Sequence, residues 1–447
     1  MVRPHRRRAP RVLGRAGREL PDRRGAGEVR LRVRAPLEGR GARGVQRRRP
    51  VRPGGDGELL RRGRHRLGRR AAVLHGRGDR RLAQDRLPLR ARVPDAADQP
   101  LAEALSTVTA HVATIRFEDG EDVAFPVPAG GSVLDAADDA GYFLASQCRA
   151  GSCGTCAATL TAGRTSDIPG RAQSLLPSER SAGARLLCST VLDGDATFEV
   201  PYPIGLVVDR PGKGRARVTS VERLSGTVTE LALELLDPPE TGFLAGQYAR
   251  LKVPGTDEWR SYSMATCGAQ LPEMRFCVKL IPGGAMTGYL EAGCRPGDEI
   301  EIEYPLGAFT LRESAEPHIF VAGGTGLAPV LSMLDELRTR RGPTPPVTLC
   351  FACQSESDLF YLDEIEMRGF WMPSLRTRVA VTEGAPSTPG VGTGTPVSLL
   401  GSRPLAPESR AYVCGPPGMI AAAVARLGEL GVPPDRIHTE KFVATDV

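Results

Sequence analysis

Nine amino acids are missing from the first quarter of the chain. After Met1, residues 2–105 contain no Ser, Thr, Lys, Ile, Phe, Tyr, Trp, Asn or Cys, and Ser106 is the first residue to break this pattern. A segment without aromatic residues and with few aliphatic runs cannot bury enough apolar surface to offset the conformational entropy lost on folding. We therefore expect residues 1–107 to form a disordered, Arg-rich extension.

The same absences bear on the origin of this extension. The ten amino acids that remain are those whose codons can all begin with G or C, as expected of a GC-rich gene read in the wrong frame. A basic arm that binds nucleic acid usually mixes Lys with Arg, and a transit peptide is rich in Ser, so both alternatives fit less well. Our hypothesis is a misassigned start codon. The next Met is Met264, so a start near Val108 or Val112 would use a GTG codon.

Long hydrophobic runs and a secretory signal are also absent. No stretch of about 18 apolar residues occurs, so the sequence predicts no membrane span. The formal charge of +7 arises from the extension, which has 30 Arg and 11 acidic residues, whereas residues 106–447 carry 29 basic and 41 acidic residues. We expect a cytoplasmic monomer with no nucleic-acid or membrane partner.

The first folded region is predicted at residues 108–200. Residues 111–117 and 123–127 alternate apolar and polar side chains, which predicts a β-hairpin, and Ser132 is placed to cap a short helix that ends near residue 140. A stretch rich in Pro and Gly, 201–214, is expected to be a linker.

Two further domains are predicted after this linker. Residues 213–313 contain short strands separated by Gly and Pro turns, which predicts an antiparallel β-barrel. Residues 316–447 alternate apolar strands with helices, one of them expected at 359–368, and this alternation predicts a parallel α/β sheet. The expected fold class is therefore multidomain.

All ten Cys follow residue 147, and their spacing predicts a metal centre. Cys148, Cys153 and Cys156 form a C-x4-C-x2-C pattern, and Cys188 follows 32 positions later, which is the spacing of plant-type [2Fe–2S] proteins. The small residues between the ligands allow backbone N–H groups to approach the cluster sulfurs. A structural zinc site is the alternative, but such sites usually combine C-x2–4-C pairs. In a chain without a secretory signal, clustered Cys favour metal binding over disulfides.

On this motif, residues 111–200 resemble the β-grasp ferredoxin domain. The whole of 108–447 is similar to the three-domain reductases of the benzoate/anthranilate dioxygenase and phenol hydroxylase type, within the ferredoxin–NADP reductase superfamily. The resemblance implies that the predicted barrel binds FAD and that the predicted α/β domain binds NAD.

Two further motifs match the flavin site of that superfamily. Residues 260–263 (RSYS) resemble its R-x-Y-S motif, which implies that Arg260 pairs with the flavin pyrophosphate, Tyr262 packs on the isoalloxazine and Ser263 hydrogen-bonds the nitrogen that takes up hydride. Residues 283–287 (GGAMT) open a helix with bare amides, a ready anion site. Either motif alone could be an ordinary edge strand or turn. The FAD-binding residues expected are Arg260, Ser261, Tyr262, Ser263, Gly284, Met286 and Thr287.

The nucleotide motif follows an apolar strand and opens a helix. In residues 321–329 (VAGGTGLAP), backbone amides and the helix dipole face an incoming pyrophosphate, and Pro329 replaces the third Gly of G-x-G-x-x-G, a variant seen in this superfamily. Residues 352–358 offer two acids and no Arg, which repels a 2′-phosphate and favours NADH.

Two C-terminal elements also resemble the superfamily. Residues 414–419 (CGPPGM) match its C-G-P-x-x-M element near the nicotinamide, and residues 440–442 (EKF) match its tail, whose aromatic ring yields to nicotinamide. The alternatives are a structural Cys at Cys414 and a surface Phe at Phe442. The NAD-binding residues expected are Gly323, Gly324, Thr325, Gly326, Pro329, Glu356, Cys414, Gly415 and Phe442; those expected to be catalytic are Ser263, Cys414 and Phe442.

These motifs predict an NADH:acceptor oxidoreductase. Electrons would pass from NADH to FAD, then singly to the [2Fe–2S] cluster, and then to a terminal oxygenase that docks at the loop around residues 149–155. The expected partner is an aromatic-ring dioxygenase. A multicomponent hydroxylase, a monooxygenase or a P450 are alternatives of the same class, and a zinc-containing nucleic-acid-binding protein that uses the basic arm is an alternative of a different class.

Overall fold

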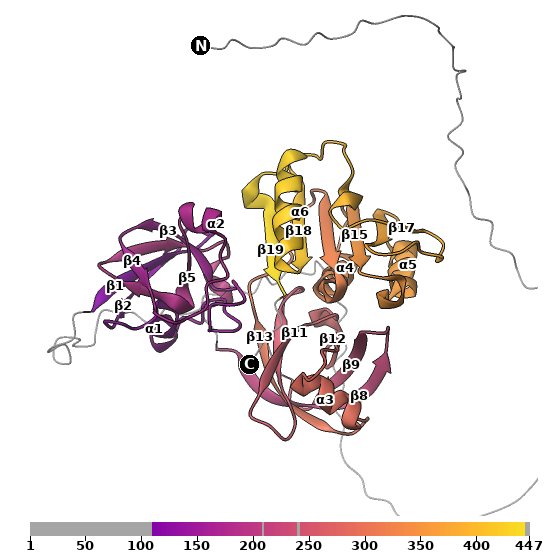
Figure 1. Ribbon diagram of the computed structural model, residues 1–447, viewed down its shortest axis with the longest axis horizontal. Coiled ribbons are helices and arrows are strands. Elements are labelled where there is room, and N and C mark those ends of the chain that lie inside the picture. The colour runs from indigo at the N-terminus through magenta and orange to yellow at the C-terminus, as the bar shows by residue number, and fades with distance from the viewer. Residues whose placement is uncertain (1–109, 208–209, 239–241, 443–447) are drawn as a thin grey trace, which may run out of the picture. The chain divides into compact units, whose positions relative to one another are not determined.

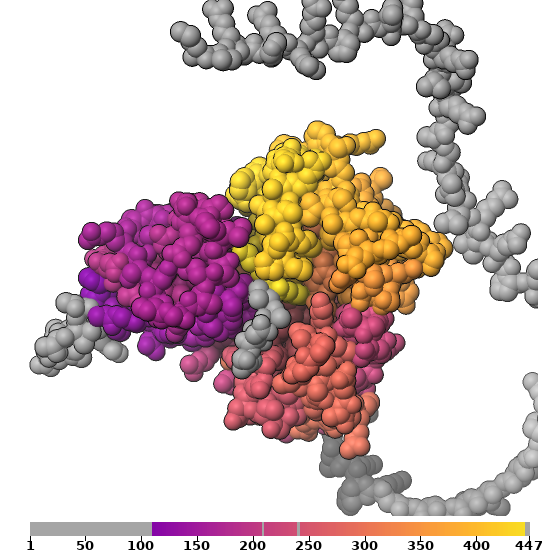
Figure 2. Space-filling view, viewed as in Figure 1, coloured from indigo at the N-terminus to yellow at the C-terminus, as the bar shows by residue number. Residues whose placement is uncertain are grey.

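The computed structural model describes residues 110–207, 210–238 and 242–442, which form three domains (Figures 1 and 2). We expected a disordered extension or a misassigned start codon at residues 1–107, and these residues lie outside the described ranges. Within the described ranges, no helix is both long and apolar enough to cross a membrane.

The first domain is a β-grasp fold, as the resemblance implied (Figure 1). Its main sheet has the order β2-β1-β7-β3-β5; β1 pairs antiparallel with β2 and parallel with β7. The helix α1 begins where Ser132 accepts a hydrogen bond of 3.0 Å from the Asp135 N–H, which confirms the predicted cap. The elements are β1 (His111–Arg116), β2 (Asp122–Val127), α1 (Val133–Asp139), β3 (Ala157–Ala162), β4 (Thr165–Asp167), α2 (Pro177–Ser181), β5 (Ala184–Leu186), β6 (Thr190–Leu192) and β7 (Ala196–Glu199).

The second domain is an antiparallel barrel. Its six strands have the order β11-β10-β13-β8-β9-β12, and a bridge between Met264 and Phe276 joins the two edges. Alternate strand residues such as Leu231, Leu251 and Ile302 fill the interior and are fully buried. The elements are β8 (Gly212–Arg223), β9 (Val228–Leu235), β10 (Tyr248–Lys252), β11 (Trp259–Ser263), β12 (Glu273–Lys279), α3 (Ala285–Ala292) and β13 (Glu299–Leu306).

The strand β8 begins inside the stretch predicted as a linker. Gly212 pairs with Tyr304 and Gly214 with Ile302 on β13, so these residues belong to the barrel. The prediction of a linker to residue 214 was wrong at its C-terminal end because glycines pair in a sheet wherever the neighbouring strand supplies the partner groups.

The third domain is a parallel six-stranded sheet with the order β17-β16-β15-β14-β18-β19 (Figure 1). The order reverses between β14 and β18, and parallel sheets bind ligands at the carboxyl ends of strands at such a switch point. The elements are β14 (His318–Gly323), α4 (Leu327–Thr339), β15 (Val347–Cys353), α5 (Leu362–Trp371), β16 (Leu375–Val381), β17 (Val391–Thr393), β18 (Arg410–Gly415), α6 (Pro417–Glu429) and β19 (Ile437–Lys441).

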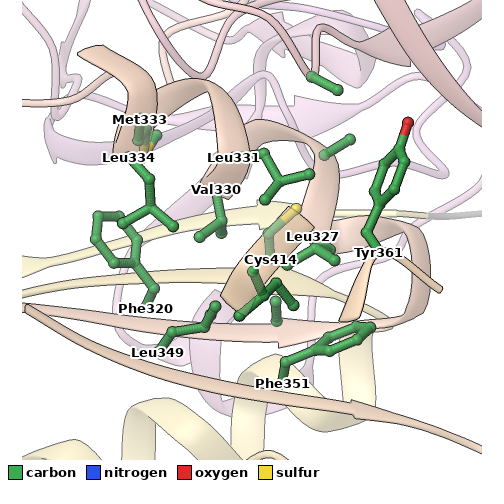
Figure 3. Close-up of a cluster of buried hydrophobic side chains, with 14 of the residues drawn as sticks. Phe320, Leu327, Val330, Leu331, Met333, Leu334, Leu349, Phe351, Tyr361 and Cys414 are labelled. Carbon is green, nitrogen blue, oxygen red and sulfur yellow. The ribbon is translucent and has the colours of Figure 1, made fainter. Parts of the chain in front are cut away.

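Both faces of this sheet are buried. On β14, Phe320 packs in the cluster that contains α4, whereas Ile319 and Val321 pack in the cluster that contains α6. Figure 3 shows Phe320, Leu349 and Phe351 from the sheet beside Val330, Leu331 and Leu334 of α4. Because both faces are covered, the strands are nearly continuous apolar runs. Such runs could be recognised as strands from the sequence.

The helix predicted at 359–368 begins three residues later, at Leu362. Tyr361 has a φ of 57°, in the left-handed region, so it cannot belong to the first helical turn. Leu359, Phe360 and Tyr361 are buried, so these apolar residues pack in the core instead of starting the helix. The hydroxyl of Tyr361 donates a hydrogen bond to Glu230 of the barrel. This long-range contact has no signature in the local sequence.

Candidate functional site

The four Cys of the predicted cluster motif lie together in the first domain. Cys148, Cys153 and Cys156 are on the loop between α1 and β3, and Cys188 is in the turn that follows β5. They form two pairs, Cys148 with Cys153 and Cys156 with Cys188, and within each pair the interaction of the two thiols shifts their pKa values. Two pairs of thiolates are what two bridged irons require.

Backbone amides surround these sulfurs. The N–H groups of Ala150 and Cys153 donate to the Cys148 Sγ at 3.4 and 3.3 Å, and the Thr155 N–H donates to the Cys153 Sγ at 3.5 Å. The hydrogen bond from Cys153 is the main cause that lowers the pKa of the Cys148 thiol, with further bonds from Ser152 and the amides. Hydrogen bonds of this kind stabilise thiolates and the negative charge of a reduced cluster.

The packing of the loop explains one of its glycines. Gly151 has a φ of 84°, and a Cβ there would lie 1.9 Å from the carbonyl oxygen of Ala172. Only Gly fits this close approach.

Arg171, which was not singled out from the sequence, joins the two segments that carry the predicted cluster ligands. Its guanidinium donates to the carbonyl oxygens of Arg149, at 3.0 Å, and of Cys188. It therefore braces the loop against the turn. No motif signalled this role, because the contact is made to backbone atoms.

The predicted flavin residues meet at one side of the barrel. Arg260, Tyr262 and Ser263 lie on β11, and Gly284 is the residue before α3, with Met286 and Thr287 in its first turn. The Thr287 Oγ1 accepts a hydrogen bond of 2.9 Å from the Ile281 N–H, which shapes this turn. The Arg260 guanidinium bonds the Trp259 carbonyl and Glu258, so a pyrophosphate would have to compete for it.

The predicted nucleotide residues lie at the switch point of the parallel sheet. Gly323, Gly324 and Thr325 follow β14, and Gly415 ends β18. Gly326 packs so closely on β18 that a Cβ would lie 2.3 Å from the Cys414 carbonyl oxygen. These glycines bring the ends of β14 and β18 together. Pro329 is buried within α4, where it contributes to packing.

A single cavity of about 1700 Å³ joins these elements. This volume exceeds that of a usual small-molecule pocket and can hold more than one nucleotide. Cys148, Ala150 and Ser152 of the cluster loop also line it. Among the residues predicted to bind FAD or NAD, the cavity is lined by Arg260, Ser261, Tyr262, Ser263, Gly284, Met286, Thr287, Gly323, Gly324, Thr325 and Phe442, whereas Gly326, Pro329, Glu356, Cys414 and Gly415 are not among its lining residues.

Glu440 is a cavity residue that was not singled out from the sequence. It accepts a hydrogen bond of 3.1 Å from the Ser263 hydroxyl, and the Cys414 Sγ lies 3.9 Å away. Glu440 is partly exposed on the side that faces the cavity. On its other sides protein atoms surround it densely, and this burial raises the pKa of its carboxyl to about 8. Burial and the nearby Glu440 raise the pKa of the Cys414 thiol well above its usual value, so this thiol is neutral.

Tyr248 connects the barrel to the cluster loop. Its side chain is buried, lines the cavity and donates a hydrogen bond to the Ser146 carbonyl oxygen, two residues before Cys148. No motif in the sequence pointed to Tyr248. Contacts between domains are not visible in a local pattern.

The acidic residue that faces the nucleotide region of the cavity is Glu383. Glu356, which was predicted to bind NAD, accepts hydrogen bonds from the amides and hydroxyls of Ser387 and Thr388, at 2.6 to 3.2 Å, and these lower its pKa to about 2. Its carboxylate is thus ionised and already bonded. Glu383 lines the cavity with Gln354, whose amide donates to it at 2.9 Å.

Three family models match successive parts of the chain. They are the 2Fe-2S iron-sulfur cluster binding domain at residues 116–193, the oxidoreductase FAD-binding domain at 215–311 and the oxidoreductase NAD-binding domain at 320–425. The cofactors predicted from the motifs, an [2Fe–2S] cluster, FAD and NAD, are therefore confirmed at the level of the domains. The zinc alternative is set aside.

Relatives that combine the three domains are reductase components of oxygenases. The chain is 33% identical over 343 residues to the reductase component of propane 2-monooxygenase from Rhodococcus jostii, covering 74% of this chain and 89% of the relative. It is 31% identical to the electron transfer component of toluate 1,2-dioxygenase from Pseudomonas putida, covering 75% and 99%.

A solved structure supports the same assignment. The crystal structure of a cytochrome P450 reductase from Amycolatopsis matches with a TM-score of 0.57 and 26% identity, covering 74% of this chain and 98% of that one. The chain therefore belongs to the family of oxygenase reductase components, electron-transfer oxidoreductases that join a [2Fe–2S] ferredoxin domain to FAD- and NAD-binding domains.

Proposed function

We propose that this chain supplies electrons from NADH to the terminal oxygenase of an aromatic-ring dioxygenase. The observation that supports this most directly is the single cavity lined by the flavin motifs, the nucleotide turns and the cluster loop. When bound, the nicotinamide, the flavin and the cluster would together supply the conversion of a two-electron hydride donor into single-electron steps. The protein itself has mainly to hold these groups in position.

The proposed flavin site rests on the barrel residues. Arg260 and the amides at the start of α3 would hold the pyrophosphate, since a guanidinium and a helix N-terminus both favour phosphate oxygens. Tyr262, which is mostly buried, would pack on the isoalloxazine ring. Ser263, held by Glu440, would present its hydroxyl where hydride is taken up.

The proposed nucleotide site lies at the ends of β14 and β18. Gly323, Gly324 and Thr325 would offer amides to the pyrophosphate, with Gly326, Pro329 and Gly415 shaping the turn behind them. Phe442 is half-buried, and its N–H donates to the Gly415 carbonyl oxygen at 2.9 Å. Its ring would leave its place when nicotinamide enters, beside the neutral thiol of Cys414.

We propose that acidic groups select NADH. A carboxylate near the ribose repels a 2′-phosphate and can bond a free hydroxyl. Glu383 faces the cavity, whereas Glu356 is bonded to Ser387 and Thr388, so Glu383 would contact the ribose and Glu356 would hold the loop that presents it.

The partner would dock where the cluster loop reaches the surface. Arg149 and Ala150 of this loop are exposed, and Cys148 is half-buried, so an acceptor can approach the cluster from this side.

We also propose that the protein is a cytoplasmic monomer whose domains span 108–200, 213–313 and 316–447.

A second candidate function is supported by the comparisons. The identity to the propane monooxygenase reductase component, 33%, is similar to the 31% for the toluate dioxygenase component, and a P450 reductase shares the fold and 26% identity. The partner would then be a monooxygenase or a P450. The electron path within the chain would be unchanged.

Reconstitution distinguishes these partners. The purified chain and NADH would be mixed with the oxygenase component of an aromatic-ring dioxygenase, of a multicomponent monooxygenase or with a P450, each freed of its own reductase, and product formation per NADH consumed would be measured. We expect the tightest coupling with the dioxygenase. Coupling with only the monooxygenase or the P450 would favour the second candidate, and no coupling with any oxygenase would contradict both.

A further inference from the structure

The C-terminal strand β19 presents its residues alternately to two sides. Glu440 bonds Ser263 and, like Phe442, lines the cavity. Lys441 lies between them, and successive side chains of a strand point to opposite faces. Its Nζ lies 3.2 Å from the Glu179 Oε1 on α2 of the cluster domain.

The stem of Lys441 also covers the cluster loop. A Cβ on Gly154 would lie 3.3 Å from the Lys441 Cδ and 3.7 Å from its Nζ, so the side chain runs over the backbone between Cys153 and Cys156. Only 18% of the Lys441 side chain is exposed, against 36% for Glu179. An ion pair of this kind, with one partner mostly buried, holds its geometry better than a fully exposed pair.

Other contacts also hold the cluster domain to the rest of the chain, among them the packing of Ala308, just after β13, on its core and two long-range hydrogen bonds. Arg312 bonds Glu118 at 2.8 Å, and Tyr248 bonds the Ser146 carbonyl oxygen. The contact with Glu118 is made by the turn after β1, not by the cluster loop. Tyr248 joins the cavity to the cluster loop from the barrel, whereas Lys441 does so from the nucleotide-binding domain, where its chain neighbours Glu440 and Phe442 line the cavity.

We propose that Lys441 is a positioning residue, which holds the cluster-binding loop at a fixed place relative to the nucleotide cavity. The inference rests on the proposed function. The rate of electron transfer between two centres falls steeply with their separation, so a loose loop would slow the step from FAD to the cluster. Hydride transfer at the cavity does not depend on this contact.

The test uses the full-length holoprotein with Lys441→Ala, Lys441→Glu and the charge exchange Lys441→Glu with Glu179→Lys. A matched control is Lys252→Ala, which removes a 3.0 Å pair between Lys252 on β10 and the partly exposed Glu301 on β13. Rapid anaerobic mixing with NADH follows the bleaching of flavin and of cluster absorbance in one trace. We expect flavin bleaching at the wild-type rate in all variants, and cluster bleaching slowed about threefold to tenfold in the two single variants. The charge exchange should restore most of the rate.

A second readout does not depend on turnover. Hydrogen exchange of amides in 150–156 and 176–182, measured by mass spectrometry, should be faster in Lys441→Glu and return toward wild type in the charge exchange. Cluster bleaching and amide exchange that stay at wild-type values in both single variants would overturn the inference. Loss of flavin bleaching in wild type and control alike would instead overturn the proposed function.

Discussion

Among single residues, Cys188 is the most informative of the four predicted cluster ligands to change, because it lies outside the loop that carries the other three. Cys188→Ser leaves the loop sequence intact but removes one of four thiolates. We expect loss of iron–sulfur absorbance and of bound iron, with FAD content unchanged.

The matched control is Cys294→Ser, since Cys294 is a partly buried thiol of the barrel near Tyr289. This variant should keep both chromophores. Iron content that stays at two per chain in Cys188→Ser would contradict the ligand assignment.

The raised pKa of Glu440 predicts that the free energy of unfolding depends on pH. Its pKa is about 8 in the folded protein, chiefly through burial, and about 4.3 for a free Glu side chain. Between these values the folded state binds more protons than the unfolded state, so the free energy of unfolding falls as pH rises from about 4.3 to about 8. Glu440→Gln cannot ionise and lacks this slope. We expect the wild type to lose about 2–4 kcal/mol more than the variant between pH 5 and 9.

Urea unfolding of the FAD-free protein at both pH values measures this difference. Glu301→Gln, at a side chain that is more than half exposed, serves as the control and should follow the wild type. Parallel pH dependence in wild type and Glu440→Gln would show that Glu440 is ionised throughout.

Glu383 predicts the choice between NADH and NADPH. Glu383→Ser removes a carboxylate from the cavity and should raise kcat/KM for NADPH about tenfold, because one like-charge contact costs about 1–2 kcal/mol in a partly buried site. Steady-state rates with an acceptor that takes electrons from FAD measure the ratio. Glu356→Gln is the comparison: if it changes the ratio more than Glu383→Ser, Glu356 contacts the ribose.

At the scale of elements, the sequence predicted those whose signal is local. The hairpin of β1 and β2 alternates apolar and polar residues, and the buried strands β14, β15 and β18 are apolar runs, so both types were recognised. The strand β19 was missed because its HTE segment is polar; it is held by pairing with β18 along Ala411–Gly415. The start of α5 was misplaced because Leu359, Phe360 and Tyr361 serve contacts that are distant in sequence.

The contact between α4 and α5 predicts a large effect on stability. Arg368 on α5 is 3% exposed and makes two bonds to Asp335 on α4, at 3.0 and 2.8 Å, and one to Glu364 at 2.6 Å. Arg368→Met leaves the buried Asp335 without its partner, which costs about 3–5 kcal/mol. Thermal or urea unfolding should show this loss.

The comparison is Arg426→Met on α6, whose pair with Glu429 is exposed and should contribute no more than about 0.5 kcal/mol. Equal effects of the two substitutions would mean that burial does not determine the strength of the Arg368 pair.

At the scale of the whole molecule, the kinds of cofactor could be predicted but their common site could not. Each motif indicates its cofactor because the residues predicted to bind it are neighbours in sequence, as in Cys148–Cys156 or Arg260–Ser263. The cavity is different, since it is assembled from the cluster loop, β11, the start of α3 and the end of β19. Glu440, Tyr248 and Lys441 matter through residues more than 100 positions away, and no local spacing shows that.

The central claim is that one chain carries electrons from NADH through FAD to the [2Fe–2S] cluster. The most direct measurement is an anaerobic titration of the purified protein with NADH, followed by its visible spectrum. We predict that flavin and iron–sulfur absorbance both bleach, at far lower NADH than NADPH. Bleaching of the flavin alone would contradict the proposed path to the cluster, and a colourless protein would contradict the account as a whole.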